Sequence, residues 1–209
     1  TSIGGSAFYQ CTSLENVSIP DNVTSIGNEA FYGCTSLETV SIPDSVSSIG
    51  ISSFQGCTAL QSLSLGRGIT SIGTNAFAEC AAIATLVLNN PIPTKFTAPV
   101  GTSGRREIGF VESHLLASRG AIREVIIGDS VTGIGFSAFW GCSRLETGNI
   151  SISVMNIRNN AFNRCGSLKT LSIRSSVSYI GHAAFAQSGL TSLSLPEKIG
   201  LVSFMLCSR

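Results

Sequence analysis

The sequence predicts an α/β repeat solenoid with a parallel sheet on one face and short helical turns opposite. A fixed 23-residue period carries this prediction, because periods of about 20 to 50 residues mark stacked repeats. Phenylalanine follows it at Phe8, Phe31, Phe54 and Phe77, and again at Phe139, Phe162 and Phe185. Cysteine follows three residues later at Cys11, Cys34, Cys57, Cys80, Cys142 and Cys165. We therefore interpret residues 1–209 as a single repeat domain of about 8–9 repeats.

The composition is apolar and sparsely charged. Hydrophobic residues make up 43% of the chain, charged residues 12%, and the net charge is +1. A buried interior under a surface of Ser and Thr is the expected result. The near-neutral balance gives no reason to expect nucleic acid as a partner. No apolar run approaches the roughly 20 residues of a membrane-spanning helix, so none is predicted.

Each repeat begins with a segment whose spacing favours a helix. In residues 26–34, Ile26, Ala30, Phe31 and Cys34 fall at i, i+4, i+5 and i+8. This stripe predicts one or two helical turns.

A strand is expected next, over residues 37–42. Val40 and Ile42 alternate as on a half-buried strand, and Pro43 followed by Asp44 is typical of a turn. Stacked repeats would bring successive strands about 4.8 Å apart in a parallel sheet.

An Ile-Gly pair precedes most of these segments, at residues 3–4, 26–27, 49–50, 72–73, 134–135 and 180–181. Glycine there predicts either an unusual backbone conformation or a close approach that a Cβ atom would obstruct. Arg158 stands in its place after Ile157, so the preference is not absolute.

The array departs from its period once in the interior. Leu116 occupies the next Phe position after Phe77, 39 residues later, which leaves 16 extra residues around positions 89–109. Pro91, Pro93 and Pro99, with Gly101 and Gly104, predict an irregular inserted loop there. The first residues already match the middle of a repeat, so we expect the chain to be a fragment of a longer protein.

The pattern Leu-x-x-Val-x-Ile-Pro, preceded by Ile-Gly-x-x-Ala-Phe-x-x-Cys, resembles the BspA-type leucine-rich repeats. The resemblance implies a right-handed solenoid that serves in protein–protein contact or adhesion. It favours an extracellular or cell-surface location, with an organelle or intracellular assembly as the alternative.

Reactive chemistry is not expected from this inventory. The cysteines should stack in one column as buried apolar thiols, which neither pair as disulfides nor surround a metal. The histidines are His114, close in sequence to Glu112, and His182, which occupies a variable and exposed position. Since no nucleophile, base and orienting group can be assembled, we expect no enzyme and no cofactor.

A contact site is predicted where the loop meets the sheet. Val87 and Ile126 would form an apolar spot on the outward face, beside Glu124. The loop adds Lys95, Phe96, Arg105 and Arg106. We expect a non-catalytic interaction or adhesion module that binds a protein through this face. The low charge leaves an alternative open, a scaffold subunit buried in a larger assembly.

Overall fold

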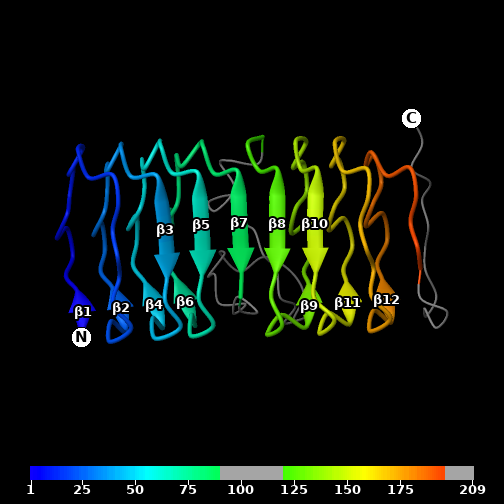
Figure 1. Ribbon diagram of the computed structural model, residues 1–209, viewed down its shortest axis with the longest axis horizontal. Coiled ribbons are helices and arrows are strands. Elements are labelled where there is room, and N and C mark those ends of the chain that lie inside the picture. Colours follow the sequence, from blue (N-terminus) through cyan, green and yellow to red (C-terminus); the bar gives the residue numbers. More distant parts are fainter. Residues whose placement is uncertain (90–119, 196–209) are drawn as a thin grey trace, which may run out of the picture.

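A computed structural model describes residues 1–89 and 120–195, and it is a solenoid of stacked coils (Figure 1). Its main sheet is parallel and has the order β10-β8-β7-β5-β3. The strands are β3 (Thr39–Ile42), β5 (Ser62–Leu65), β7 (Thr85–Leu88), β8 (Glu124–Ile127) and β10 (Thr147–Ile150). Every strand alternates outward and inward residues, so one face of the sheet covers the core.

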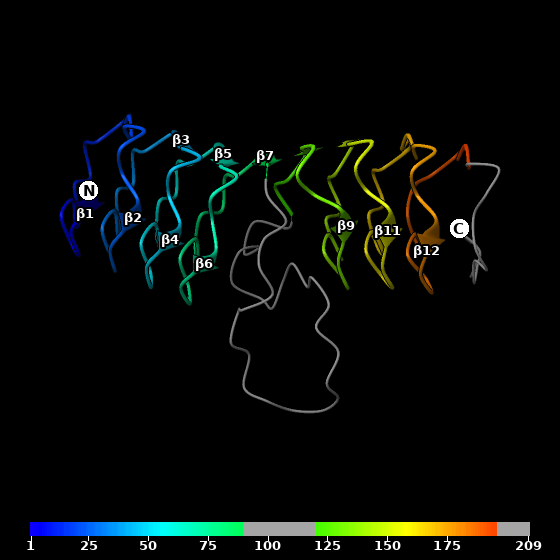
Figure 2. The same cartoon turned by 90° about the horizontal axis from the view of Figure 1, so that it is seen from below.

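Short strands that end at the isoleucine of each Ile-Gly pair, or at Ile157 before Arg158, form two smaller parallel sheets along another side of the solenoid (Figure 2). One contains β1 (Ser2–Ile3), β2 (Ser25–Ile26), β4 (Ser48–Ile49) and β6 (Ser71–Ile72). The other contains β9 (Gly133–Ile134), β11 (Asn156–Ile157) and β12 (Tyr179–Ile180). In each, an isoleucine faces the core and its neighbour faces outward.

The main sheet stays continuous across the long interruption of the repeat. Ser62 pairs with Thr85, 23 residues later, and Thr85 then pairs with Glu124, 39 residues later. Strands β7 and β8 are therefore direct neighbours, and the extra residues between them do not open the sheet. The predicted loop itself lies outside the described residues.

The predicted helical turns are wrong, because the described residues contain no helix. Two residues around each Phe instead adopt the left-handed region, one two places before it and one two places after. The earlier ones have φ between 52° and 59°: Ser6, Glu29, Ser52, Asn75, Ser137, Asn160 and Ala183. The later ones have φ between 54° and 75°: Gln10, Gly33, Gly56, Glu79, Gly141, Arg164 and Gln187. A left-handed residue ends an α-helix, so the segment folds as consecutive β-turns.

Hydrogen bonds explain why this arrangement replaces a helix. In the coil of Phe31, the amides of Glu29, Phe31 and Gly33 donate to carbonyls of the following coil at 2.7–2.8 Å. The amides between them close turns within the coil, as Tyr32 does to the Glu29 carbonyl at 3.1 Å. The same alternation recurs around Phe8, Phe54, Phe139 and Phe162. Every second amide that would bond within a helix thus bonds to the next coil instead.

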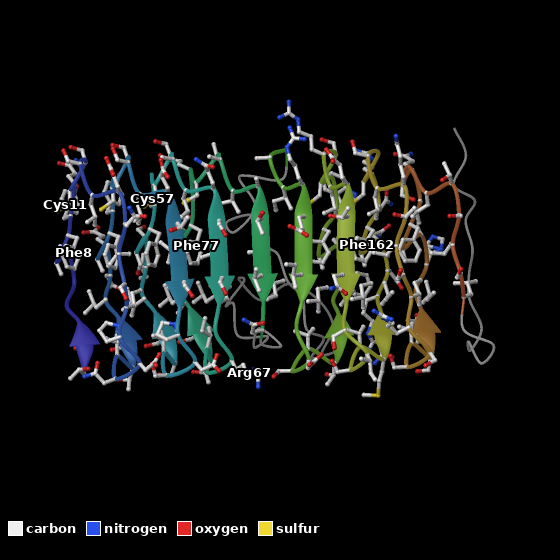
Figure 3. The ribbon with its side chains drawn as sticks, viewed as in Figure 1. Phe8, Cys11, Cys57, Arg67, Phe77 and Phe162 are labelled. Carbon is white, nitrogen blue, oxygen red and sulfur yellow. The ribbon has the colours of Figure 1, made fainter. Side chains whose placement is uncertain are left out.

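The core is a set of stacked columns (Figure 3). Phe rings of adjacent coils stack with centroids 5.0–5.6 Å apart. Phe31, Phe54 and Phe77 are fully buried, together with the leucine column represented by Leu37 and Leu60. Each coil buries its apolar edge only against its neighbours, which is the organisation that the 23-residue period predicts.

Glycine in the Ile-Gly pair is required by close approach. A Cβ atom on Gly50 would lie 2.5 Å from the backbone nitrogen of Asn28 in the preceding coil, and one on Gly27 would lie 2.5 Å from that of Gly5. On Gly4, which has no coil before it in the structure, nothing lies within 4 Å. Since none of these three glycines has a positive φ, the constraint is the spacing between coils and not the backbone conformation.

Candidate functional site

The outward face of the main sheet presents two parallel rows of side chains. One row contains Thr39, Ser62, Thr85, Glu124 and Thr147, and the other Ser41, Ser64, Val87, Ile126 and Asn149. Their backbones are neighbours in a parallel sheet, so the side chains repeat about every 4.8 Å. The face is therefore regular and rich in hydroxyl groups, with a single charged side chain, Glu124, in the two rows.

The predicted apolar spot lies at the centre of this face. Val87 and Ile126 are direct partners in the register of β7 and β8, and both are half-buried. Glu124 is exposed and pairs with Thr85 in the adjoining row. The sequence thus placed these three residues together correctly. Lys95, Phe96, Arg105 and Arg106 lie outside the described residues.

The turn aspartates connect coils. The Asp44 carboxylate accepts a hydrogen bond from the Arg67 amide of the next coil at 2.7 Å, and the Arg67 side chain lies 3.9 Å from it. The Asp129 carboxylate accepts a hydrogen bond from the Ser151 hydroxyl of the next coil. Asp44 follows Pro43 and Asp129 follows Gly128, and each carboxylate accepts a hydrogen bond from the next coil.

Five cysteines are buried and unoxidised: Cys34, Cys57, Cys80, Cys142 and Cys165. The Cys57 thiol donates to the Phe31 carbonyl of the preceding coil at 3.3 Å, and Cys165 donates to Phe139 at 3.1 Å. Burial, with a smaller effect from the nearby Cys57, raises the pKa of Cys34 to about 11. Thiols that stay protonated are poor nucleophiles and poor metal ligands.

Cys11 differs from the other described cysteines because it is exposed. It belongs to the first described coil, and no earlier coil covers it in the structure. The sequence pattern assigned it to the buried column, since its repeat position is the same. Position within the stack, which the repeat pattern does not contain, decides its exposure.

Side chains that could bind a metal do not cluster among the described residues. His182 is exposed, as predicted, and its amide donates to the Asn159 side chain at 3.0 Å. Within residues 1–89 and 120–195, His, Cys, Asp and Glu side chains do not gather in groups of three that could hold a metal ion. His114 and Glu112 lie outside this part of the chain. Over the same ranges there is also no helix that could cross a bilayer.

A set of aromatic contacts behind the sheet was not anticipated from the sequence. Tyr9 and Tyr32, each directly after a Phe, stack with ring centroids 5.0 Å apart. At the equivalent position further along, the Arg164 guanidinium lies 5.2 Å from the centre of the Trp140 ring. In three repeats an aromatic residue follows the Phe, which the sequence does show. What each of these rings contacts depends on the residue that the neighbouring coil places beside it.

Columns of this kind, with the parallel sheet and the Phe-x-x-Cys turns, match a known repeat family. Its model, the BspA type leucine rich repeat region in six copies, matches residues 1–96 and 110–208. The chain belongs to this family. As a BspA-type leucine-rich repeat chain, it is a repeat protein in which Phe, Cys, Leu and Ile form the core.

Three solved structures of leucine-rich repeat proteins resemble the chain. Those from Treponema pallidum (TpLRR) and Bacteroides ovatus are each 27% identical, with TM-scores of 0.52 and 0.59. They match over 83% and 95% of this chain, and over 73% and 47% of their own chains. A protein from Eubacterium ventriosum, 22% identical, shares the fold with a TM-score of 0.54 over 90% of this chain and 40% of its own. A search of curated proteins gave no match.

This BspA-type chain therefore spans about half or less of two of these relatives. What the likeness establishes is the repeat family and its parallel-sheet solenoid.

Proposed function

We propose that the chain is a non-catalytic recognition module that binds a protein through the outward face of its main sheet, at the cell surface. The observation that carries the proposal is the face itself. It is regular, nearly uncharged and centred on Val87 and Ile126, which adjoin each other in neighbouring strands. Membership of the BspA-type family supports an interaction role.

The centre of the face fits a protein partner better than a small ligand. A partner can bury the apolar side chains of Val87 and Ile126. The rows of Ser and Thr around them supply hydrogen-bond donors and acceptors. An apolar centre with a polar rim is the usual anatomy of a protein–protein interface. The loop residues Lys95, Phe96, Arg105 and Arg106 belong to the proposal because their segment lies between β7 and β8 in the sequence.

The test compares two pairs of substitutions on the same face. V87D/I126D places two charges at the centre, whereas T39D/S41D places two on β3, two strands away from β7. Both chains are used to capture surface proteins from native cells, and captured proteins are quantified against the unmodified chain. The proposal requires a protein whose capture falls at least tenfold with V87D/I126D and less than twofold with T39D/S41D. Equal capture by all three chains would refute a site at the centre of the face.

A deletion of residues 91–106 tests the contribution of the loop to binding separately from that of the sheet face. If the loop takes part, deletion weakens binding of the captured protein while the unfolding midpoint stays within a few degrees. An unchanged affinity would remove Lys95, Phe96, Arg105 and Arg106 from the site and leave Val87 and Ile126. Antibody labelling of intact cells tests the proposed location separately.

A further inference from the structure

The charges of the chain are separated along the axis of the solenoid. Residues 1–89 contain six acidic side chains and one basic, Arg67, while residues 120–195 contain six basic side chains and three acidic. The net charge of +1 therefore conceals an acidic first half and a basic second half. Opposite halves of this kind can attract each other between two copies of the chain.

The separation is organised on one edge of the main sheet, which we call the leading edge. It consists of the residue directly before each main-sheet segment: Glu15, Glu38, Gln61, Ala84, Arg123, Glu146, Lys169 and Thr191. From Glu38 to Glu146, the amide of each member donates to the carbonyl of the member before it, at 2.8–3.0 Å. The leading edge is thus one regular row, with one residue in each coil. In Figure 1 it lies along the top, where the arrows of the main sheet begin.

The two ends of the leading edge carry opposite charges without a partner in the described residues. Glu15 and Glu38 are exposed, occupy adjacent coils and form no ion pair there. At the other end, Lys169 and Arg144 are exposed, occupy adjacent coils and likewise form none. Arg144 lies two residues before Glu146 in its coil. Arg123 and Glu146 neutralise each other at 2.8 Å.

The charges near the two ends of this row are complementary. A two-fold axis at Ala84 maps Glu15 onto Lys169 and Glu38 onto Glu146, and it leaves the uncharged Thr191 without a counterpart. Glu15 of one copy then faces Lys169 of the other. Glu38 faces the coil of Glu146, whose carboxylate is paired with Arg123 in its own chain and which also carries Arg144. The centre is small, with Ala84 and Ala82 half-buried and no charged residue in the coil of Ala84 at this edge. An isologous interface requires this reciprocal arrangement. If residue i of one copy contacts residue j of the other, residue j of the first copy also contacts residue i of the second.

We propose that two copies of this chain pair antiparallel along their leading edges, with Glu15 and Glu38 of each copy against Lys169 and Arg144 of the other. The pairing goes beyond the recognition role proposed above and does not depend on it. Exposed ion pairs contribute little each, so the dimer is weak and sensitive to salt. Ionic screening acts over about 30 Å at 0.01 M salt and about 3 Å at 1 M.

Sedimentation equilibrium of the 209-residue chain up to about 1 mM tests the pairing. We expect dimers at 0.01 M salt and a dissociation constant at least tenfold higher at 1 M salt. E15K/E38K and R144E/K169E should each be monomeric alone, because like charges then face each other. Mixed together, they should form a heterodimer, since every pair is again attractive. That rescue also shows that both variants are folded.

A matched control and a covalent link identify the surface. D21K makes the same charge change as E15K in the same coil but at the far end of the strand, so it should leave the dimer intact. A zero-length carbodiimide should couple the Glu15 carboxylate to the Lys169 amine with loss of water. Six coil spacings of about 4.8 Å separate these residues within a chain, so this link forms only between copies.

The proposal would be overturned by a wild-type chain that remains monomeric at 0.01 M salt, by an E15K/E38K variant that dimerises as the wild type does, or by a variant mixture that stays monomeric. Dimers without the link from Glu15 to Lys169 would assign association to another surface and equally refute the antiparallel edge.

Discussion

Residues in this solenoid are defined by their column more than by their own chemistry. Phe54 stacks between the Phe31 and Phe77 rings, with centroids 5.0 and 5.2 Å away. The preceding residue is usually Ala, and Ser53 takes its place in one coil. The buried Ser53 hydroxyl lies 2.8 Å from the carbonyls of both Gly27 and Gly50, so it is satisfied where it stands.

At this scale, F54A and S53A should change the free energy of unfolding by very different amounts, although both residues are fully buried. F54A leaves a cavity in the ring stack and should lower the free energy of unfolding by about 3–5 kcal/mol. S53A restores the residue of the other coils and should change it by less than about 1 kcal/mol. Urea titration followed by circular dichroism measures both. A loss for S53A as large as that for F54A would mean that the hydroxyl fixes the coil spacing.

Each coil is held by hydrogen bonds to its neighbours as well as by the turns within it. The segment after each Ile-Gly pair carries the apolar spacing of a helix, yet it forms turns that donate alternate amides to the next coil. A helical stripe and this chain of turns both bury residues four and five apart, so the pattern alone does not separate them. The left-handed residues that distinguish them are mostly Ser, Asn, Glu and Gln, which give no clear sequence signal.

The prediction at the scale of the element concerns the spacing of coils. G50A would place a Cβ atom 2.5 Å from the Asn28 nitrogen and 2.6 Å from the Gly27 carbonyl carbon. Because these are backbone atoms, the coils must separate, at a cost of about 1–3 kcal/mol or more. G4A occupies the same repeat position with nothing within 4 Å and should be close to neutral. Thermal unfolding of both variants checks this, and equal midpoints would contradict the steric explanation.

The two ends of the solenoid are not equivalent. Its main-sheet strands all run parallel, and the described amides that link the Phe turns of adjacent coils point toward the C-terminal side of the stack. Acidic side chains gather at the first half and basic ones at the second. A row of buried thiols runs through the same stack, and it connects the stability of the whole array to pH.

Stability should fall at alkaline pH because of these thiols. The pKa of Cys34 rises from 9.0 to about 11 on folding, chiefly through burial. Between those values the unfolded chain loses the proton that the folded chain keeps. The free energy of unfolding therefore decreases with rising pH, by up to about 1.4 kcal/mol per pH unit for one thiol. Below pH 9 this contribution is fully present.

Comparison with C34A isolates the thiol from other groups that titrate in this range. Urea unfolding at pH 7.5, 9 and 10 should give a steeper loss for the wild type than for C34A. Parallel pH profiles for the two chains would show that Cys34 keeps an ordinary pKa in the folded state.

The sequence by itself determined the repeat family, the core columns, the main-sheet strands and the contact between Val87 and Ile126. It could do so because a 23-residue period fixes which residues stack, whatever the local conformation of each coil. Only the tertiary structure decided that the Phe segments form turns and that Cys11 is exposed. It also showed that the glycine of the Ile-Gly pair is required because adjacent coils lie too close for a Cβ atom. The charged leading edge also emerged only there. Each of these depends on what the neighbouring coil places beside a residue, and the order of residues within one coil does not contain that information.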